Sequence, residues 1–307
     1  MKKLIALLIP LLFSTCQPLA QIVEKKDWCT SKCDAAGDEK KNSKMVHDCM
    51  HNDSIMQHVQ TMDLMRFPLR FGIVQQQSNG IDSSKAKIHL AIKQLNQAYA
   101  PANLEFYVER VEAIPSSLSI EDLSADAYEP YIQFSKAHDL PDLISVYVFD
   151  HAHEFCQITP TSISCGRTGG FSFILSDITS NLVLSHFDLT DQKVVAHEFG
   201  HFFGLYHTFE EAQFGKDDFD ESRCEEIGDG ICDTPPDPGV VFEVYVNYSN
   251  CEMIGLENKA GKAYAPLINN YMSYYKPCYL KPYHFTPGQI QVMKIAAQSS
   301  LRKKFSR

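Results

Sequence analysis

The chain has 307 residues, of which 44% are hydrophobic and 21% are charged, so it is long and apolar enough to bury a folded core. This composition excludes an intrinsically disordered protein. The formal net charge of −10, with no basic stripe to neutralise phosphates, excludes nucleic acid as a main partner.

The N-terminus predicts export. Residues 1–20 carry two lysines, an apolar stretch from Leu4 to Phe13, and then small and polar residues. This is the layout of a signal peptide, and the apolar stretch is too short to span a bilayer. We expect cleavage after Ala20 and a secreted, extracellular protein. Alternatively, cleavage before Cys16 and lipidation of that cysteine would anchor the protein at the cell envelope, and only then do we expect membrane contact.

Residues 21–65 are polar and charged, and we interpret them as a leader separate from the folded domain. Residues 83–100 predict an amphipathic helix, because their apolar side chains recur on one helical face. Cys156 and Cys165 bracket a loop rich in Gly and Thr. Four segments read as strands: 66–74, 103–111, 142–150 and 171–177.

The second half of the chain begins with an amphipathic helix that contains the sequence HEFGHFFGLYH (197–207). We expect this helix to end at Gly204, because glycine adopts the left-handed conformation that ends helices. Residues 208–269 are loop-rich, and 285–304 predict a closing helix with Pro287 in its first turn. Strands and helices followed by a loop-rich part indicate an α+β fold with a small sheet.

The histidines in this helix predict a zinc site. His197 and His201 are four residues apart, so both rings project from one helical face. The turn at Gly204 lets His207 return as a third nitrogen ligand, which leaves the fourth position of zinc for water. Glu198 lies beside that face, where it can take a proton from the water. The alternative is a core helix with incidental histidines, but the full HExxHxxGxxH spacing favours zinc.

HEFGHFFGLYH resembles the zinc-binding motif of the metzincin metalloproteases, and Met272 in NYMSYY (270–275) resembles their methionine turn. Within that clan the chain is similar to the pappalysin-like (cytophagalysin, ulilysin-type) family. This similarity is carried by NYMSY, by GDGICDTPPDP (228–238) and by FTPGQ (285–289).

The resemblance implies a catalytic domain over 66–307 with a cleft between two parts. The upper part, 66–206, would hold a small, twisted mixed sheet and the active-site helix, and the lower part, 207–307, would be loop-rich. The resemblance also implies a secreted endopeptidase that acts on proteins or peptides. Tyr274 matches a tyrosine that stabilises the tetrahedral intermediate.

The resemblance further implies calcium at GDGICDTPPDP, where Asp229 and Thr234 match ligand positions. Composition alone also fits a tight turn in which Asp233 caps local backbone amides. The family carries two disulfides in the loop-rich half. Our first pairing is Cys224 with Cys251 and Cys232 with Cys278, and Cys156 with Cys165 would close the short loop.

Three cysteines of the leader, Cys29, Cys33 and Cys49, remain after this pairing. One of them, as a thiolate, would occupy the open zinc position and keep the enzyme latent, or it would form an intermolecular disulfide. We hypothesise latency as a role for the leader.

The predicted reaction is hydrolysis of a peptide bond, with the substrate extended along an edge strand near 171–185. Residues 273–285 contain Lys276 and Lys281 but no carboxylate, so we expect a neutral or apolar preference on the primed side. Two alternatives stay open. A secreted binding or adhesion protein would keep the metal without turnover, although Glu198 would then have no task, and an exopeptidase would require free substrate ends.

Overall fold

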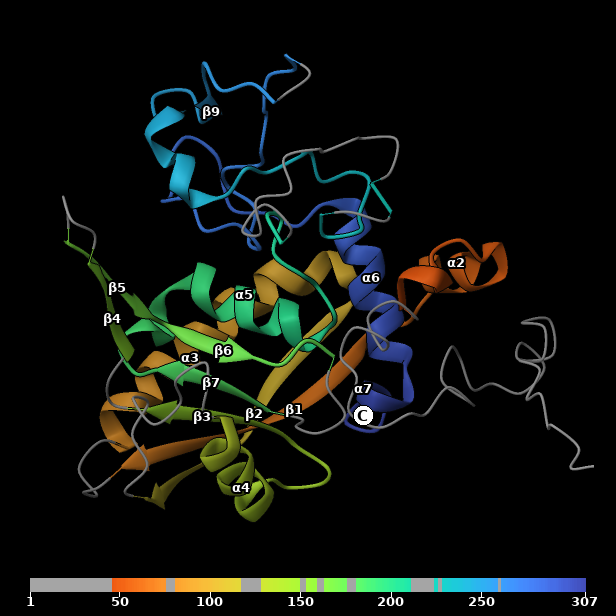
Figure 1. Ribbon diagram of the computed structural model, residues 1–307. Helices are drawn as coiled ribbons and strands as arrows, with labels where there is room; N and C mark the ends of the chain where they lie inside the picture. Colours follow the sequence, from red (N-terminus) through yellow and green to blue (C-terminus); the bar gives the residue numbers. More distant parts are fainter. Residues whose placement is uncertain are drawn as a thin grey trace, which may run out of the picture.

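A computed structural model describes residues 46–75, 81–116, 128–149, 153–158, 163–175, 181–210, 224–225, 228–258 and 261–307 (Figure 1). The predicted signal peptide, Cys16, Cys29 and Cys33 lie outside these residues. Within the described part of the chain, no helix is long and apolar enough to cross a membrane.

A five-stranded sheet forms the base of the molecule, in the order β2-β1-β3-β7-β6. The strands β1, β2, β3 and β7 run parallel, whereas β6 pairs antiparallel with β7 at one edge. The small mixed sheet of an α+β fold is therefore confirmed. The strands span Met65–Gln75 (β1), Leu104–Pro115 (β2), Ile144–Phe149 (β3), Gly170–Ser172 (β6) and Asn181–Ser185 (β7).

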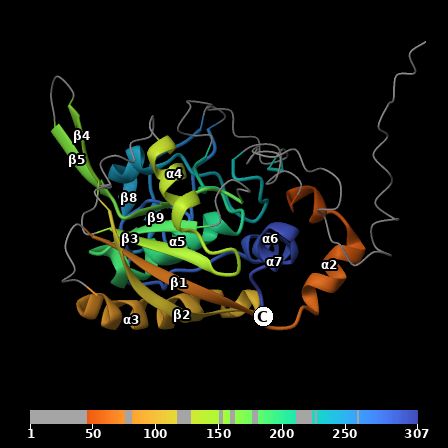
Figure 2. The ribbon, with the colours of Figure 1, turned by 90° about the horizontal axis from the view of Figure 1, so that it is seen from below.

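Both faces of the sheet are buried, because side chains alternate between two hydrophobic clusters. In β3, Val146 and Val148 face the main core under α3 (Ile81–Tyr99) and α5 (Gln192–Phe202). Tyr147 faces a smaller cluster under α4 (Tyr128–His138). Figures 1 and 2 show α4 on the side of the sheet opposite to α5. The buried β3 strand therefore reads as a continuous apolar run.

The segment that we interpreted as a separate leader contributes to this core. Residues 46–49 are helical, and α2 (Asp53–Gln60) begins at Asn52, whose side chain caps the Ile55 amide. Val46, Ile55 and Val59 are buried in the main cluster, and α2 contacts α6 (Pro287–Gln298). The sparse apolar residues of 46–62 are thus spaced to bury one helical face, which hydrophobic content alone did not reveal.

The C-terminal part is loop-rich and ends in a helix, as expected. Thr286 and Gln289 form a reciprocal capping box at the start of α6, with Pro287 in its first turn. Ser299 interrupts the closing helix, which we predicted as one segment. The remaining elements here are η8 (Val240–Tyr245), β8 (Val246–Asn247), β9 (Glu252–Met253), α6 (Pro287–Gln298) and α7 (Ser300–Lys303).

The predicted disulfide pairing in this part is wrong: the bridges are Cys224–Cys232 and Cys251–Cys278. Cys251 and Cys278 belong to a small separate cluster with Met253, Ile268 and Tyr275. Cys232 instead follows Ile231, which is buried in the main core. Each of the four cysteines is therefore bonded to a different partner from the one predicted.

Three other expectations need correction. The loop predicted between Cys156 and Cys165 is a hairpin of β4 (His153–Ile158) and β5 (Ile163–Thr168), whose register sets these two cysteines opposite each other. Their side chains lie outside the described residues. Of the strand predicted at 171–177, only the start lies in β6, and a turn follows at 174–175. The sequence patterns also did not predict α4 or β7.

Candidate active site

The helix α5 brings two histidines to one buried face. Asp191 caps it, with Oδ1 accepting from the Lys193 and Val194 amides. His197 and His201 are each 5% exposed. The phenylalanines Phe199, Phe202 and Phe203 are buried in the main core, as predicted.

The chain reverses at Gly204, where φ is +90°. The Gly204 amide donates to the His201 carbonyl, and the Leu205 amide donates to the Gly200 carbonyl. This is the left-handed helix end that the sequence predicted. It returns the chain so that His207, three residues later, lies beside the two helix histidines.

The three imidazoles meet at their Nε2 atoms. His201 Nε2 lies 3.0 Å from His197 Nε2 and 3.1 Å from His207 Nε2. The other ring nitrogen, Nδ1, faces an acceptor in each case. His197 Nδ1 lies 2.8 Å from the Tyr271 carbonyl, and His201 Nδ1 lies 2.7 Å from the Leu205 carbonyl. His207 Nδ1 lies 3.1 Å from Glu210 Oε2. Each Nδ1 therefore donates, and each Nε2 directs a lone pair inward.

This arrangement fits a metal ion. Burial lowers the pKa of His197 and lowers that of His201 to about 3, so both rings are neutral. Neutral lone pairs at this distance would repel one another unless a cation lay between them. Nitrogens about 2.0–2.1 Å from a tetrahedral zinc ion would be about 3.3 Å apart, close to the separations found here. In the part of the chain that is described, these three side chains form the one group of His, Cys, Asp and Glu residues that could hold a metal.

Glu198 lies next to this group with a free acceptor. Its side chain is buried, and Oε2 has no hydrogen-bond partner among the described residues. Burial raises the pKa of the carboxyl to about 8. The edge strand β6 approaches it closely: a Cβ on Gly170 would lie 2.9 Å from Glu198 Cγ. A group with a raised pKa and an open oxygen is suited to proton transfer.

The segment around Met272 packs beneath the histidines. Met272 is fully buried, and a Cβ on Gly200 would lie 2.5 Å from its sulfur, so the close approach needs glycine in the helix. The Thr208 amide donates to the Met272 carbonyl. The methionine turn predicted at this position therefore lies against α5, directly under the ring group.

Tyr274 lies at the same group from the other side. Its ring centroid is 5.4 Å from that of His197 and 4.8 Å from that of His207. The side chain is 49% exposed. Partial burial and the charges of Glu198 and Glu210 raise the pKa of the phenol, which therefore remains a hydrogen-bond donor.

The two calcium candidates lie together in the 228–238 turn. Asp229 Oδ1 accepts from the Ile231 amide and from the Thr234 hydroxyl, while Oδ2 has no hydrogen-bond partner among the described residues. Burial raises the pKa of Asp229 to about 8. Asp233 accepts from the Gly288 amide at the start of α6, so it caps a distant helix and not the local backbone amides that the turn interpretation expected.

One latency candidate is excluded. Cys49 is disulfide-bonded and 4% exposed, so it has no thiolate to offer a metal. The packing of residues 46–62 into the core explains why this cysteine is enclosed.

Glu210 is a site residue that the sequence analysis missed. Its carboxylate faces His207 Nδ1, three residues away on the turn that follows the motif. Carboxylate partners of metal-binding histidines orient the ring and increase its basicity. The acidic pair Glu210 and Glu211, directly after HTF, is the sequence signal for this partner.

Comparisons with known proteins agree with this geometry. A family model described as pregnancy-associated plasma protein-A, the M43 peptidases, matches residues 177–298, which include all three histidines and Met272. This part of the chain is similar to the pappalysin-like metallopeptidases. A model of reprolysin-like metallopeptidases, also of the metzincin type, matches residues 85–208. The resemblance drawn from the motifs is thereby confirmed.

Three fungal relatives are named extracellular metalloproteases. The protein of Colletotrichum graminicola is 30% identical over 210 residues, 67% of this chain and 66% of the relative. That of Neurospora crassa is 28% identical over 207 residues, 66% and 63% of the two chains. The protein of Arthroderma gypseum is 34% identical over 107 residues, which are 34% of this chain and 30% of the relative. The chain thus spans just under two thirds of the first relative and less of the others.

Proposed function

We propose that the protein is a secreted, zinc-dependent endopeptidase. The convergence of three imidazole Nε2 atoms beside the open oxygen of Glu198 carries this proposal. The names of the relatives support proteolysis outside the cell. Protein and peptide chains are the expected substrates.

His197, His201 and His207 would hold the zinc ion. When bound, zinc supplies Lewis-acid chemistry by lowering the pKa of water from 15.7 toward about 7 and by polarising a carbonyl. The Nδ1 partners described above keep the three rings aligned for this task.

Glu198 is the general base and then the general acid. Its carboxylate takes a proton from the attacking water as the oxygen bonds to the scissile carbonyl carbon. It then donates that proton to the amine nitrogen as the carbon–nitrogen bond breaks. A pKa raised by burial suits both steps, because the group must accept and release a proton near neutral pH.

Tyr274 would donate a hydrogen bond to the developing oxyanion. Its protonated phenol and its ring contacts with His197 and His207 support this role. The substrate would extend along β6, the edge strand that contacts Glu198 through Gly170. Pairing with this edge adds main-chain hydrogen bonds that do not depend on substrate sequence.

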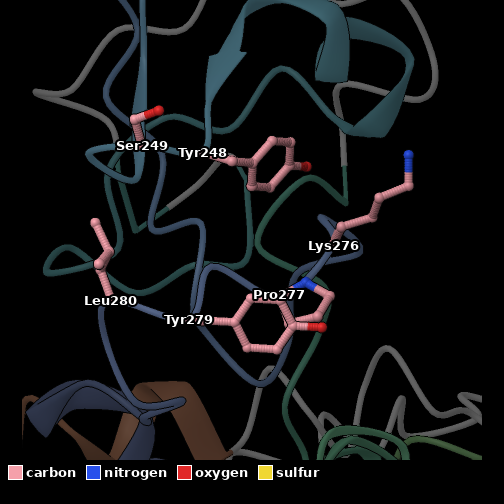
Figure 3. Close-up of a pocket in the computed structure, with 6 residues that line it drawn as sticks. All are labelled: Tyr248, Ser249, Lys276, Pro277, Tyr279 and Leu280. Carbon is pink, nitrogen blue, oxygen red and sulfur yellow. The ribbon is translucent and has the colours of Figure 1, made fainter.

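A neutral or apolar preference is the proposed specificity. Glu243, a carboxylate outside the predicted loop, reaches Lys276 Nζ at 3.2 Å and accepts from Tyr248. The Glu243 carboxylate is therefore paired with Lys276 and Tyr248 and is not available to bind a basic substrate side chain. Lys276 also lines a cavity of about 410 Å³, together with Tyr248, Ser249, Pro277, Tyr279 and Leu280 (Figure 3). Aromatic and aliphatic walls favour apolar side chains over arginine or lysine.

Asp229 and Thr234 would contribute to a calcium site. The free Oδ2 of a buried carboxylate supports a cation there, since an isolated buried charge is costly. The proposed division is a signal peptide (1–20), a leader (21–65) and a catalytic domain (66–307), with residues 46–62 of the leader packed into the core of the catalytic domain. A latency role for the leader now rests on Cys29 or Cys33.

The deciding experiment is a casein assay of the purified protein, with and without a chelator, with Glu198→Ala as the control. We expect turnover that chelation abolishes, zinc restores, and Glu198→Ala lowers by about 10²–10⁴-fold. A protein that binds zinc but does not cleave casein or peptides would be a binding protein. Cleavage of end-blocked peptides distinguishes an endopeptidase from an exopeptidase.

A further inference from the structure

Asp237 is a buried carboxylate that no part of the zinc motif explains. It is 4% exposed, and it accepts three hydrogen bonds. Oδ2 accepts from the Thr208 hydroxyl at 2.6 Å. Oδ1 accepts from the Tyr275 hydroxyl at 2.7 Å and from the Gly239 amide at 2.9 Å.

Two of these donors directly follow residues of the active site. Thr208 follows His207, and Tyr275 follows Tyr274. The two segments also meet through the backbone, where the Thr208 amide donates to the Met272 carbonyl at 3.2 Å. One carboxylate thus joins the segment carrying the third histidine to the segment carrying the tyrosine.

The catalytic helix is attached at the same point. Lys193, in the first turn of α5, donates from Nζ to the Tyr275 carbonyl at 2.5 Å. Its charge lies in the field of Asp237. Helix, third-histidine segment and methionine turn are therefore linked through Tyr275 and Asp237.

Tyr274 has little else to hold it. Its described contacts are ring contacts with His197, His207 and Phe209, and its side chain is half exposed. Its position therefore depends on the backbone of 272–275. His207 is held at its ring by Glu210, but its backbone position depends on the neighbouring Thr208.

We propose that Asp237 is a positioning residue that sets the third histidine and Tyr274 relative to each other. It touches neither substrate nor metal and acts through Thr208 and Tyr275. The expected effect on catalysis rests on the proposed endopeptidase function, whereas the expected effect on zinc binding rests on the geometry alone.

The competing explanation is that Asp237 only stabilises its own turn. Oδ1 accepts from Gly239, two residues on, which is a local turn bond at a glycine with φ of +88°. Thr208→Val removes one long-range bond and leaves the turn bond intact. Tyr275→Phe also leaves the Gly239 amide bond to Asp237, but it removes both the bond to Asp237 and the 3.2 Å bond from the Tyr275 hydroxyl to the Gly239 carbonyl, so its melting temperature is measured beside its activity. These two variants therefore separate positioning from turn stability.

Asp233→Asn is the matched control. Asp233 lies in the same acidic segment and also accepts two hydrogen bonds, from the Thr286 hydroxyl and the Gly288 amide, both at 2.7 Å. Those partners belong to the start of α6 rather than to the site. Its loss is expected to lower the melting temperature without changing zinc affinity.

The first measurement is zinc affinity, by competition with a chromophoric chelator on the full secreted chain. We expect Asp237→Asn and Thr208→Val to weaken zinc binding by about tenfold, as is typical for outer-shell partners of metal ligands. Asp233→Asn is expected to stay within about twofold of the wild type. If Thr208→Val binds zinc as tightly as the control, the positioning of His207 is refuted. If Asp237→Asn does not fold, the zinc affinity of Thr208→Val still tests whether this link positions His207.

The second measurement is kcat and KM on a fluorogenic peptide at saturating zinc. We expect Tyr275→Phe to lower kcat about tenfold with KM unchanged, since Tyr274 acts only on the transition state. In a Tyr274→Phe background, Tyr275→Phe should change kcat by less than about twofold. Multiplicative losses would instead show that Tyr275 does not act through Tyr274. If the wild-type protein cleaves nothing, the proposed function fails, while the zinc arm still tests Asp237.

Discussion

At the residue scale, the site is organised by the partners of its histidines as much as by the histidines themselves. Every Nδ1 has an acceptor, and two of the three acceptors are backbone carbonyls. Backbone acceptors come with the fold, whatever the side chain. Glu210 is the exception, because a substitution can remove it without disturbing the chain.

We predict that Glu210→Ala weakens zinc binding by about tenfold, the lower end of the usual range because its side chain is 33% exposed. Glu210→Gln keeps an acceptor but loses the charge, so its zinc affinity should lie between that of the wild type and that of Glu210→Ala. Glu225→Ala is the control, since Glu225 forms an exposed pair with His51 at 3.6 Å. Equal zinc affinities in chelator competition for the Glu210→Ala and Glu225→Ala variants would contradict this role.

At the scale of elements, two glycines permit the close packing on which the site depends. Gly200 lets the methionine turn reach α5, and Gly170 lets β6 lie against Glu198. In each case a single added methyl group would overlap with its neighbour. The arrangement of helix, edge strand and turn thus depends on positions without side chains.

We predict that Gly170→Ala destabilises the protein by about 1–3 kcal/mol, the usual cost of overpacking. The new Cβ would lie 2.6 Å from the Val183 carbonyl oxygen, which is backbone and cannot rotate away. It would also displace Glu198, so kcat should fall more than stability alone explains. Urea unfolding and peptide kinetics measure both effects. Ser172→Ala, on the same strand, should change stability by less than about 0.5 kcal/mol, and a similar loss in both variants would argue against close packing at Gly170.

The helix α2 gives a second prediction at this scale. Ile55 is 6% exposed in the main core, so Ile55→Ala should cost about 2–4 kcal/mol in unfolding free energy. Gln57→Ala, on the exposed face of the same helix, should cost almost nothing. If the two variants unfold at the same urea concentration, α2 is not part of the stable fold. If Ile55→Ala unfolds at a lower urea concentration than Gln57→Ala, then α2 belongs to the stable fold, and a mature enzyme that begins near Arg66 would lack part of its core.

At the scale of the whole molecule, zinc should act as a cross-link. It would join α5 to the segment that follows it, and through Tyr271 and Met272 to the C-terminal half. The bridges Cys224–Cys232 and Cys251–Cys278 act within the C-terminal half alone. The metal is therefore expected to contribute to the stability of the domain as a unit.

We predict that chelation lowers the melting temperature. Free zinc at a hundred times its dissociation constant stabilises the folded state by about 2.7 kcal/mol, or on the order of 5–10 °C for a chain of this size. Glu198→Ala should keep this zinc-dependent shift, whereas His201→Ala should lose it. Differential scanning fluorimetry with and without chelator measures the shift, and an unchanged melting temperature in the wild type would contradict zinc binding by the folded protein.

Much of this protein follows from local sequence. The spacing of His197 and His201 gives one helical face, and Gly204 ends the helix because few other residues adopt its φ of +90°. Strand alternation and the proline in the first turn of α6 likewise depend on neighbours in the chain. These features were predicted because their causes lie within a few residues.

Only the tertiary structure decided which distant residues meet. Cys251 and Cys278 meet in the small cluster, Ile55 is buried in the main core where α2 contacts α6, and the link from Asp237 to Tyr275 spans 38 residues. None of these contacts leaves a periodic trace in the sequence. Their energies come from burial and hydrogen bonds between segments, and those exist only after the chain has folded.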